Sequence, residues 1–186
     1  MKTITIIGGG PSVADIDWSP EKFPNVIAVN NAWQIAPWAA ILFFGDKRWW
    51  DKWGNRERVL KGFNNRIITC LLDYKDDPRL AYRELSGKKA DLDDPTKVLA
   101  PDSGSKAICL AYHEGAKRIE LAGFDVGLDE AGRSHFHDDH KEPSNPSNYK
   151  TFADSHRWLH GALAERGVEV VRITKPGVQE IPYAPR

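Results

Sequence analysis

Six short apolar runs, with helix-like segments between several of them, constrain the fold of this chain more than any other feature. The runs are rich in β-branched or large apolar residues and are nearly continuous, which is typical of strands covered on both faces. They are Thr3–Ile7, Val26–Asn30, Ala40–Phe44, Arg66–Leu72, Arg118–Ala122 and Val168–Ile173. The pattern predicts a doubly wound α/β fold with a mostly parallel, Rossmann-like sheet of about six strands.

Three segments between the runs have the apolar spacing of helices. They are Lys47–Lys61, Ser103–Gly115 and Tyr149–Arg166. Asp102 or Ser103 can cap the start of the second segment, and glycines end the second and third. Strands that alternate with helices in this way are expected to form one parallel sheet with helices on both faces.

The length and charge of the chain set broad limits on its class. We expect residues 1–186 to form a single Rossmann-like nucleotide-binding domain, with irregular loops near 75–101 and 127–148. Lys and Arg together number 26, as do Asp and Glu, and this balance argues against nucleic acid or anionic membrane as a partner. No membrane span or signal peptide is evident, so a cytoplasmic protein is expected. Cys70 and Cys109 are expected to be buried free thiols.

The first apolar run leads into the sequence GGGPS, at the position where a doubly wound sheet binds its ligands. Glycines allow a close approach of backbone to ligand, and proline suits the first turn of a helix. We therefore expect an anion cradle at a helix start that holds a nucleotide phosphate. Its residues would be Gly8, Gly9, Gly10, Pro11 and Ser12. A tight turn without a ligand is the alternative.

The loop does not match the common dinucleotide or triphosphate motifs. Val13 occupies the position of the third glycine of G-x-G-x-x-G, and Asn30 and Asn31 stand where an acidic residue would bind a ribose. NAD is therefore disfavoured. The chain also contains no G-x-x-x-x-G-K-[ST] sequence, which excludes a P-loop.

Other polar residues follow predicted strands or begin predicted helices. Amide and carboxylate groups at these positions can bind a base edge, a ribose hydroxyl or a metal ion. Each residue alone could instead be a cap or a turn residue. The set, which we expect to converge on one nucleotide site, is Asn30, Asn31, Asp46, Asp102, Ser103, Gly104 and Asp125.

The loop after the fifth apolar run carries three closely spaced histidines, His135, His137 and His140. With the acidic residues between them they could hold a metal ion. One of them could instead act as a general base, because the pKa of histidine lies near neutrality. A polar loop without a chemical role is the third possibility. His113 and His156 are expected to lie on helix surfaces.

Three blocks in a fixed order carry a resemblance to known families. They are IIGGGPSV, VNNAW and SGSKAICLAYHEGAKRIELAGFDVG, spread between Thr3 and Gly127. This set resembles the bacterial sialyltransferases that modify lipooligosaccharides. It also resembles a wider superfamily with motility accessory factors and 6-hydroxymethylpterin diphosphokinase-like proteins, described as domain-of-unknown-function-115-like. The phosphate-binding tyrosines of the sialyltransferases have no match in this chain.

The resemblance implies roles for individual residues. The Gly8–Ser12 segment would be the nucleotide loop, and Asn30 would contact the nucleotide. Ser103 and Gly104 match a serine–glycine pair at the cytidine site.

Further residues match positions where the two groups of relatives differ or share an acid. Asp46 stands where the sialyltransferases have asparagine and much of the wider superfamily has an acid. Asp125 matches the acidic residue of a G-x-D turn and is also a candidate catalytic residue. His135 becomes the first candidate for the catalytic base, because it matches a histidine of the wider superfamily, and His140 becomes the second.

The favoured hypothesis is a transferase with a nucleotide-activated donor. In its first form, a CMP-sugar-like nucleotide sugar donates a glycosyl group to a small-molecule or glycan acceptor, and no cofactor is required. In its second form, ATP donates a diphosphate to a hydroxymethylpterin-like substrate, with Mg²⁺ held by Asp46 or Asp125 and tryptophans stacking on the pterin. A non-catalytic nucleotide-binding protein is the alternative from another class. The sequence leaves a homo-oligomer open.

Overall fold

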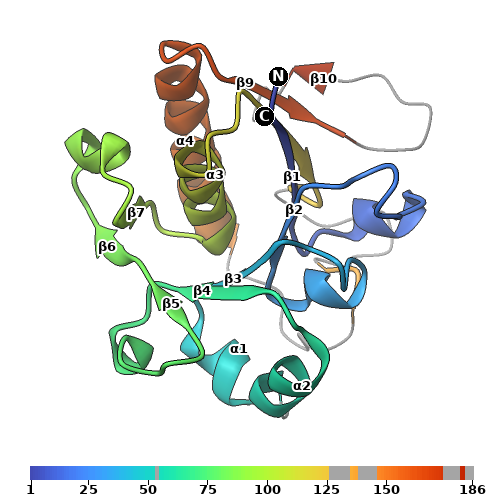
Figure 1. Ribbon diagram of the computed structural model, residues 1–186. Coiled ribbons are helices and arrows are strands. Elements are labelled where there is room, and N and C mark those ends of the chain that lie inside the picture. The colour runs from blue at the N-terminus through green and yellow to red at the C-terminus, as the bar shows by residue number, and fades with distance from the viewer. Residues whose placement is uncertain (53–54, 126–134, 138–145, 174–180, 183–186) are drawn as a thin grey trace.

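A parallel sheet runs through the molecule, as the sequence predicts (Figure 1). The computed structural model describes residues 1–52, 55–125, 135–137, 146–173 and 181–182. Within them, eight strands pair in the order β10-β9-β8-β1-β2-β3-β4-β5. The strand β10 is antiparallel to β9, and the other pairs are parallel. The strands are β1 (Thr3–Ile7), β2 (Val26–Val29), β3 (Ile41–Phe44), β4 (Arg66–Thr69), β5 (Ala81–Tyr82), β8 (Arg118–Ala122), β9 (Glu169–Arg172) and β10 (Ile181–Pro182).

The predicted fold class is confirmed, and all six apolar runs form strands of this sheet. The two strands that the sequence did not predict, β5 and β10, lie at the two edges and have two residues each. Strands this short leave no periodicity to recognise, because two residues cannot show an alternation.

The stretch 75–101 differs from the irregular loop that was expected. Besides β5, it contains β6 (Glu84–Ser86), the 3₁₀ helix η4 (Lys89–Asp93) and β7 (Lys97–Leu99). Strands β6 and β7 pair with each other in parallel as a second, two-stranded sheet. Val98 and Leu99 of β7 are buried in the same core cluster as α3. Tertiary packing therefore stabilises this strand, and the local sequence pattern did not indicate it.

Helices cover both faces of the large sheet. On one face lie α3 (Ser103–His113) and α4 (Pro146–Ala164), side by side in Figure 1. The other face is covered by η1 (Pro11–Asp15), η2 (Asn30–Gln34), α1 (Lys47–Asp51) and α2 (Asn55–Gly62). The sequence predicted one helix over Lys47–Lys61, whereas the structure has two. Lys52 takes an extended conformation, with φ −95° and ψ 159°, and ends α1.

Alternate residues of each strand pack into two separate cores. In β3, Ile41 and Phe43 belong to the cluster shared with α3 and α4, while Leu42 and Phe44 belong to the cluster shared with α1 and α2. Since both faces are apolar, the strand sequence is nearly continuous in apolar residues. Among the helices that the structure describes, none combines the length and apolar character needed to cross a membrane.

The strand order fixes the place of the candidate site. From β1 the chain runs outward through β2, β3 and β4 to β5, and it later returns to β8 on the other side of β1. The carboxyl ends of β1 and β8 therefore flank the point where the winding reverses. Ligands of doubly wound sheets bind at such a point.

Candidate functional site

The glycine loop after β1 is bound to the loop after β8. The Gly8 N–H donates to the Ala122 carbonyl at 2.8 Å, and the Gly10 N–H donates to the Gly123 carbonyl at 2.9 Å. The Ser12 N–H donates to the Asp125 carboxylate at 3.0 Å. Pro11 has no N–H, so within the described chain only the Gly9 N–H of this loop is left without a hydrogen bond. The expected cradle of outward-facing amides is therefore not formed.

The helix that was expected after the loop is also different. Pro11–Asp15 forms a 3₁₀ helix of five residues, which is too short to present an α-helical N-terminus to an anion. The glycines instead permit close packing between the two loops. A Cβ atom at Gly8 or at Gly10 would lie 2.7 Å from the Gly123 carbonyl oxygen, and one at Gly10 would also collide with Asp125. The glycines therefore allow the loop backbone to pack directly against the turn that follows β8.

Residues 135–137 cross over the glycine loop. The Phe136 N–H donates to the Gly9 carbonyl at 3.0 Å, and a Cβ atom at Gly9 would lie 2.9 Å from Cδ2 of His135. His135 is therefore brought to the switch point between β1 and β8. Its ring lies 5.3 Å from that of His137. His140 lies outside the described residues, as does most of the predicted loop 127–148.

Two neighbouring asparagines after β2 have different surroundings. Asn31 is 1% exposed, and its side-chain oxygen accepts from Nε1 of Trp49 at 2.8 Å. Its Nδ2 lies 3.2 Å from the ring nitrogens of His137, so Asn31 supports the histidine segment. Asn30 has a left-handed backbone, with φ 51°, and its buried side-chain oxygen has no partner among the described residues.

The hydroxyl of Ser12 shares this property with Asn30. It is buried and makes no hydrogen bond within the described part of the chain. Buried polar atoms are normally paired with protein or water, because an unpaired one costs roughly 1–3 kcal/mol. Ser12 and Asn30 thus place unused hydrogen-bonding capacity at the carboxyl ends of β1 and β2.

The two candidate metal ligands both have structural partners. Asp125 forms an ion pair with Arg172 of β9, in addition to its hydrogen bond from Ser12. Asp46 caps α1 by accepting from the Arg48 N–H at 2.8 Å. Within the described ranges, no three His, Cys, Asp or Glu side chains gather as a metal site. The predicted metal role of these carboxylates remains a prediction.

The start of α3 is built around a buried Asp–His pair. Asp102 caps the helix by accepting from the Ser105 N–H at 2.8 Å, and Nε2 of His156 on α4 lies 3.4 Å from its carboxylate. Burial alone would raise the pKa of Asp102, but the interactions with His156 and Ser105 lower it below its usual value. The ring of Phe124 lies 5.5 Å from that of His156. This turn is firmly held by groups from two other elements.

The prediction that His156 lies on a helix surface is wrong, because it is 4% exposed. His156 falls three residues after Ala153 and three before Leu159, on the buried stripe of α4. This spacing could have identified it. His113, in contrast, is partly buried and its Nε2 lies 2.7 Å from the Leu92 carbonyl.

The first turn of α3 reaches across the carboxyl edge of the sheet. A Cβ atom at Gly45, directly after β3, would lie 3.3 Å from the Ser103 hydroxyl. One at Gly104 would lie 2.7 Å from the ring of Phe124, which follows β8. Ala100, just before this turn, has a strained left-handed backbone with φ 86°. The structure thus brings Ser103 and Gly104 to the same edge as the glycine loop.

Both cysteines are free and buried, as predicted. Burial raises the pKa of the Cys109 thiol to about 12 and also raises that of Cys70. Neither thiol has the low pKa of a nucleophilic cysteine.

The chain is similar in structure to a bacterial glycosyl-transferring enzyme. The match is the sialyltransferase CstII from Campylobacter jejuni, solved in complex with a substrate analogue, CMP-3FNeuAc. The TM-score is 0.56 at 15% sequence identity, and the match covers 100% of this chain and 86% of the other. At this identity the likeness shows the fold. No protein-family model matches the sequence, and a search of curated proteins finds no match.

Proposed function

We propose that this protein is a glycosyltransferase whose donor is a nucleotide-activated sugar, with a CMP-sugar as the first candidate. The observation that carries the proposal is the likeness to CstII over the full chain, since the structure of that enzyme holds a CMP-sugar analogue. The position of His135 over Gly9, at the switch point of the sheet, supports it.

His135 is the proposed general base. It would take the proton of an acceptor hydroxyl while the acceptor oxygen attacks the anomeric carbon of the donor. The bond from that carbon to the phosphate oxygen breaks, and the nucleotide leaves as a monophosphate. A positioned base contributes roughly 10²- to 10⁴-fold to the rate.

The unpaired polar atoms are the proposed donor contacts. The buried side-chain oxygen of Asn30 can accept from a ribose hydroxyl or a base amine, and the Ser12 hydroxyl can donate or accept. Ser103 and Gly104, at the α3 start, would face the same ligand. Gly8–Gly10 would serve mainly to pack this edge closely against β8, with the single Gly9 amide left for a ligand.

The diphosphokinase hypothesis has weaker support from the geometry. The carboxylate of Asp125 is already balanced by Arg172, whereas Mg²⁺ favours available carboxylate oxygens. Trp49 and Trp50 are fully buried and cannot stack on a pterin. A non-catalytic nucleotide-binding protein differs from the favoured proposal in having no turnover.

The test is donor turnover with a panel of CMP-, UDP- and GDP-sugars, followed by chromatography of the released nucleotide. We expect CMP release from a CMP-sugar, at an equal rate in EDTA and in Mg²⁺. Release of AMP from ATP that requires Mg²⁺, together with loss of activity in Asp46→Asn and Asp125→Asn, would favour the diphosphokinase instead. Nucleotide binding by calorimetry without turnover of any donor would indicate a binding protein.

A further inference from the structure

The helix α3 carries a lysine that its packing does not explain. Lys106 is 5% exposed and lies in the second turn, among residues that are buried on every side of the helix. Burying an ammonium group is costly unless it is paired, and an apolar residue of similar length would pack here without that cost. Packing in the core therefore does not explain why a lysine is present at this position.

Lys106 has no ionic partner within the described chain. It makes no ion pair and no side-chain hydrogen bond to the described residues. Its backbone N–H donates to Asp102, but the Asp102 carboxylate is occupied by Ser105 and His156. The Lys106 side chain is thus largely buried, and its ammonium has no ionic partner among the described residues.

Nζ of Lys106 lies close to Gly45, directly after the carboxyl end of β3. A Cβ atom at Gly45 would lie 3.4 Å from Nζ of Lys106, 3.3 Å from the Ser103 hydroxyl and 3.4 Å from the Cys70 sulfur. Three polar atoms from α3 and from the end of β4 therefore lie around one position, and the absence of a side chain at Gly45 leaves that position open to a single atom. The positive charge of Lys106 also acts on the Cys70 thiol, where it opposes the rise in pKa caused by burial.

We propose that the Lys106 ammonium and the Ser103 hydroxyl form an anion site beside Gly45 that takes a phosphate group of the bound nucleotide. The identity of the ligand as a nucleotide rests on the proposed function, whereas the anion site rests on the burial of Lys106 and the space at Gly45. The amides of Gly8, Gly10 and Ser12 are hydrogen-bonded within the protein. They therefore cannot balance the negative charge of a bound phosphate group, which needs another partner. Lys106 supplies one at the same edge of the sheet.

The experiment compares Lys106→Met with the full-length wild type by calorimetry, using CMP, cytidine and inorganic pyrophosphate as probes. We expect Lys106→Met to weaken binding of CMP and of pyrophosphate by roughly tenfold or more and to leave cytidine binding unchanged. Lys117→Met is the matched control, because Lys117 is exposed and precedes β8 at the opposite edge of the sheet. Gly45→Ala, which fills the space, should weaken the same two anions.

Thermal unfolding is a second measurement, and it distinguishes an anion-binding lysine from a purely structural one. Removing an unpaired buried charge should raise the unfolding temperature of Lys106→Met, whereas loss of a structural contact would lower it. Equal affinity of wild type and Lys106→Met for CMP and pyrophosphate would overturn the anion site. Failure of the wild type to bind both CMP and pyrophosphate would also overturn it.

The two proposals fail separately. Pyrophosphate binding that depends on Lys106, without turnover of any nucleotide sugar, would leave the anion site standing and remove the glycosyltransferase. Turnover with unchanged KM and kcat in Lys106→Met would do the reverse.

Discussion

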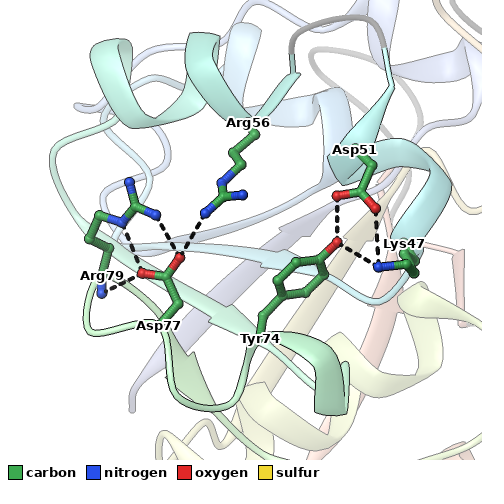
Figure 2. A network of polar contacts seen from close by, with 6 residues as sticks. All are labelled: Lys47, Asp51, Arg56, Tyr74, Asp77 and Arg79. Carbon is green, nitrogen blue, oxygen red and sulfur yellow. Dashed lines mark hydrogen bonds and ion pairs between the residues drawn. The ribbon is translucent and has the colours of Figure 1, made fainter.

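Two regions of the molecule are rich in polar side chains but use them differently: the surface network that joins α1 and α2 to the segment between β4 and β5, and the carboxyl edge around β1 and β8. Figure 2 shows the surface network, in which charged groups are paired with one another. Nζ of Lys47 lies 3.2 Å from the carboxylate of Asp51 and donates to the Tyr74 hydroxyl at 3.1 Å. Tyr74 in turn donates to Asp51.

A second group in Figure 2 is centred on Asp77. Its carboxylate accepts from Arg79 at 2.7 and 2.8 Å and from Arg56 at 3.3 Å. The two arginines are about half exposed, whereas the Asp77 side chain is 11% exposed, so solvent screens these ion pairs from the arginine side. A pair with an exposed arginine typically contributes about 1 kcal/mol or less.

At the carboxyl edge the polar groups are buried and several lack partners. Within the described residues, the Ser12 hydroxyl and the Asn30 side-chain oxygen are buried and unpaired, and the largely buried Lys106 has no ionic partner. An unpaired buried group destabilises the fold, so each one calls for an explanation such as a bound ligand or a water molecule. The comparison therefore separates a network whose charges are paired from an edge where several polar atoms of the described residues are not.

The largest effect is expected from His135 at the edge. His135→Ala should lower kcat of donor turnover by roughly 10²- to 10⁴-fold and leave nucleotide affinity nearly unchanged, because the proposed base acts on the acceptor. Steady-state kinetics and calorimetry measure the two quantities. His137→Ala is the matched control, since its ring lies beside Asn31 rather than on Gly9. Equal losses in both variants would contradict a single base and favour a shared metal site.

An intermediate effect is expected from the charge of Asp102. Its folded-state pKa is lowered, so its ionisation stabilises the protein above the ordinary pKa near 3.8, and this contribution is lost as the pH falls through the lower value. Asp102→Asn retains a capping side chain but removes the charge. We expect a loss of about 2 kcal/mol at pH 7 in urea unfolding, and a difference that shrinks steadily as the pH falls below 3.8. A loss that stays constant as the pH falls would mean that packing, and not charge, is affected.

The smallest effect is expected from the same substitution in the surface network. Hydrogen bonds from Arg79 lower the pKa of Asp77 to about 2, from an ordinary value of 3.8. The stabilisation is therefore complete above about pH 4 and is lost as the pH falls through 2. Solvent screening limits the loss in Asp77→Asn to less than about 1 kcal/mol at pH 7, measured by urea unfolding. If Asp77→Asn costs as much as Asp102→Asn, the contrast between the two regions does not hold.

Local periodicity in the sequence was sufficient to predict six of the eight described strands of the central sheet and its mostly parallel character. Apolar runs such as Ile41–Phe44 are determined by burial on both faces, which any local window records. The cap at Asp102 and the end of α3 near Gly115 were also predicted, because capping depends on residues a few positions apart. The buried state of both cysteines followed from the same apolar runs.

Only the tertiary structure decided which polar groups at the edge are occupied. The amides of the glycine loop are bound because β8, more than 110 residues later, pairs directly with β1. In the same way, His156 is buried because α4 packs on the start of α3, and Lys106 is isolated because no described carboxylate reaches it. Strand order and helix packing join distant segments through contacts that local spacing does not encode. The sequence alone could therefore determine where the candidate site lies, but not which of its atoms are left for a ligand.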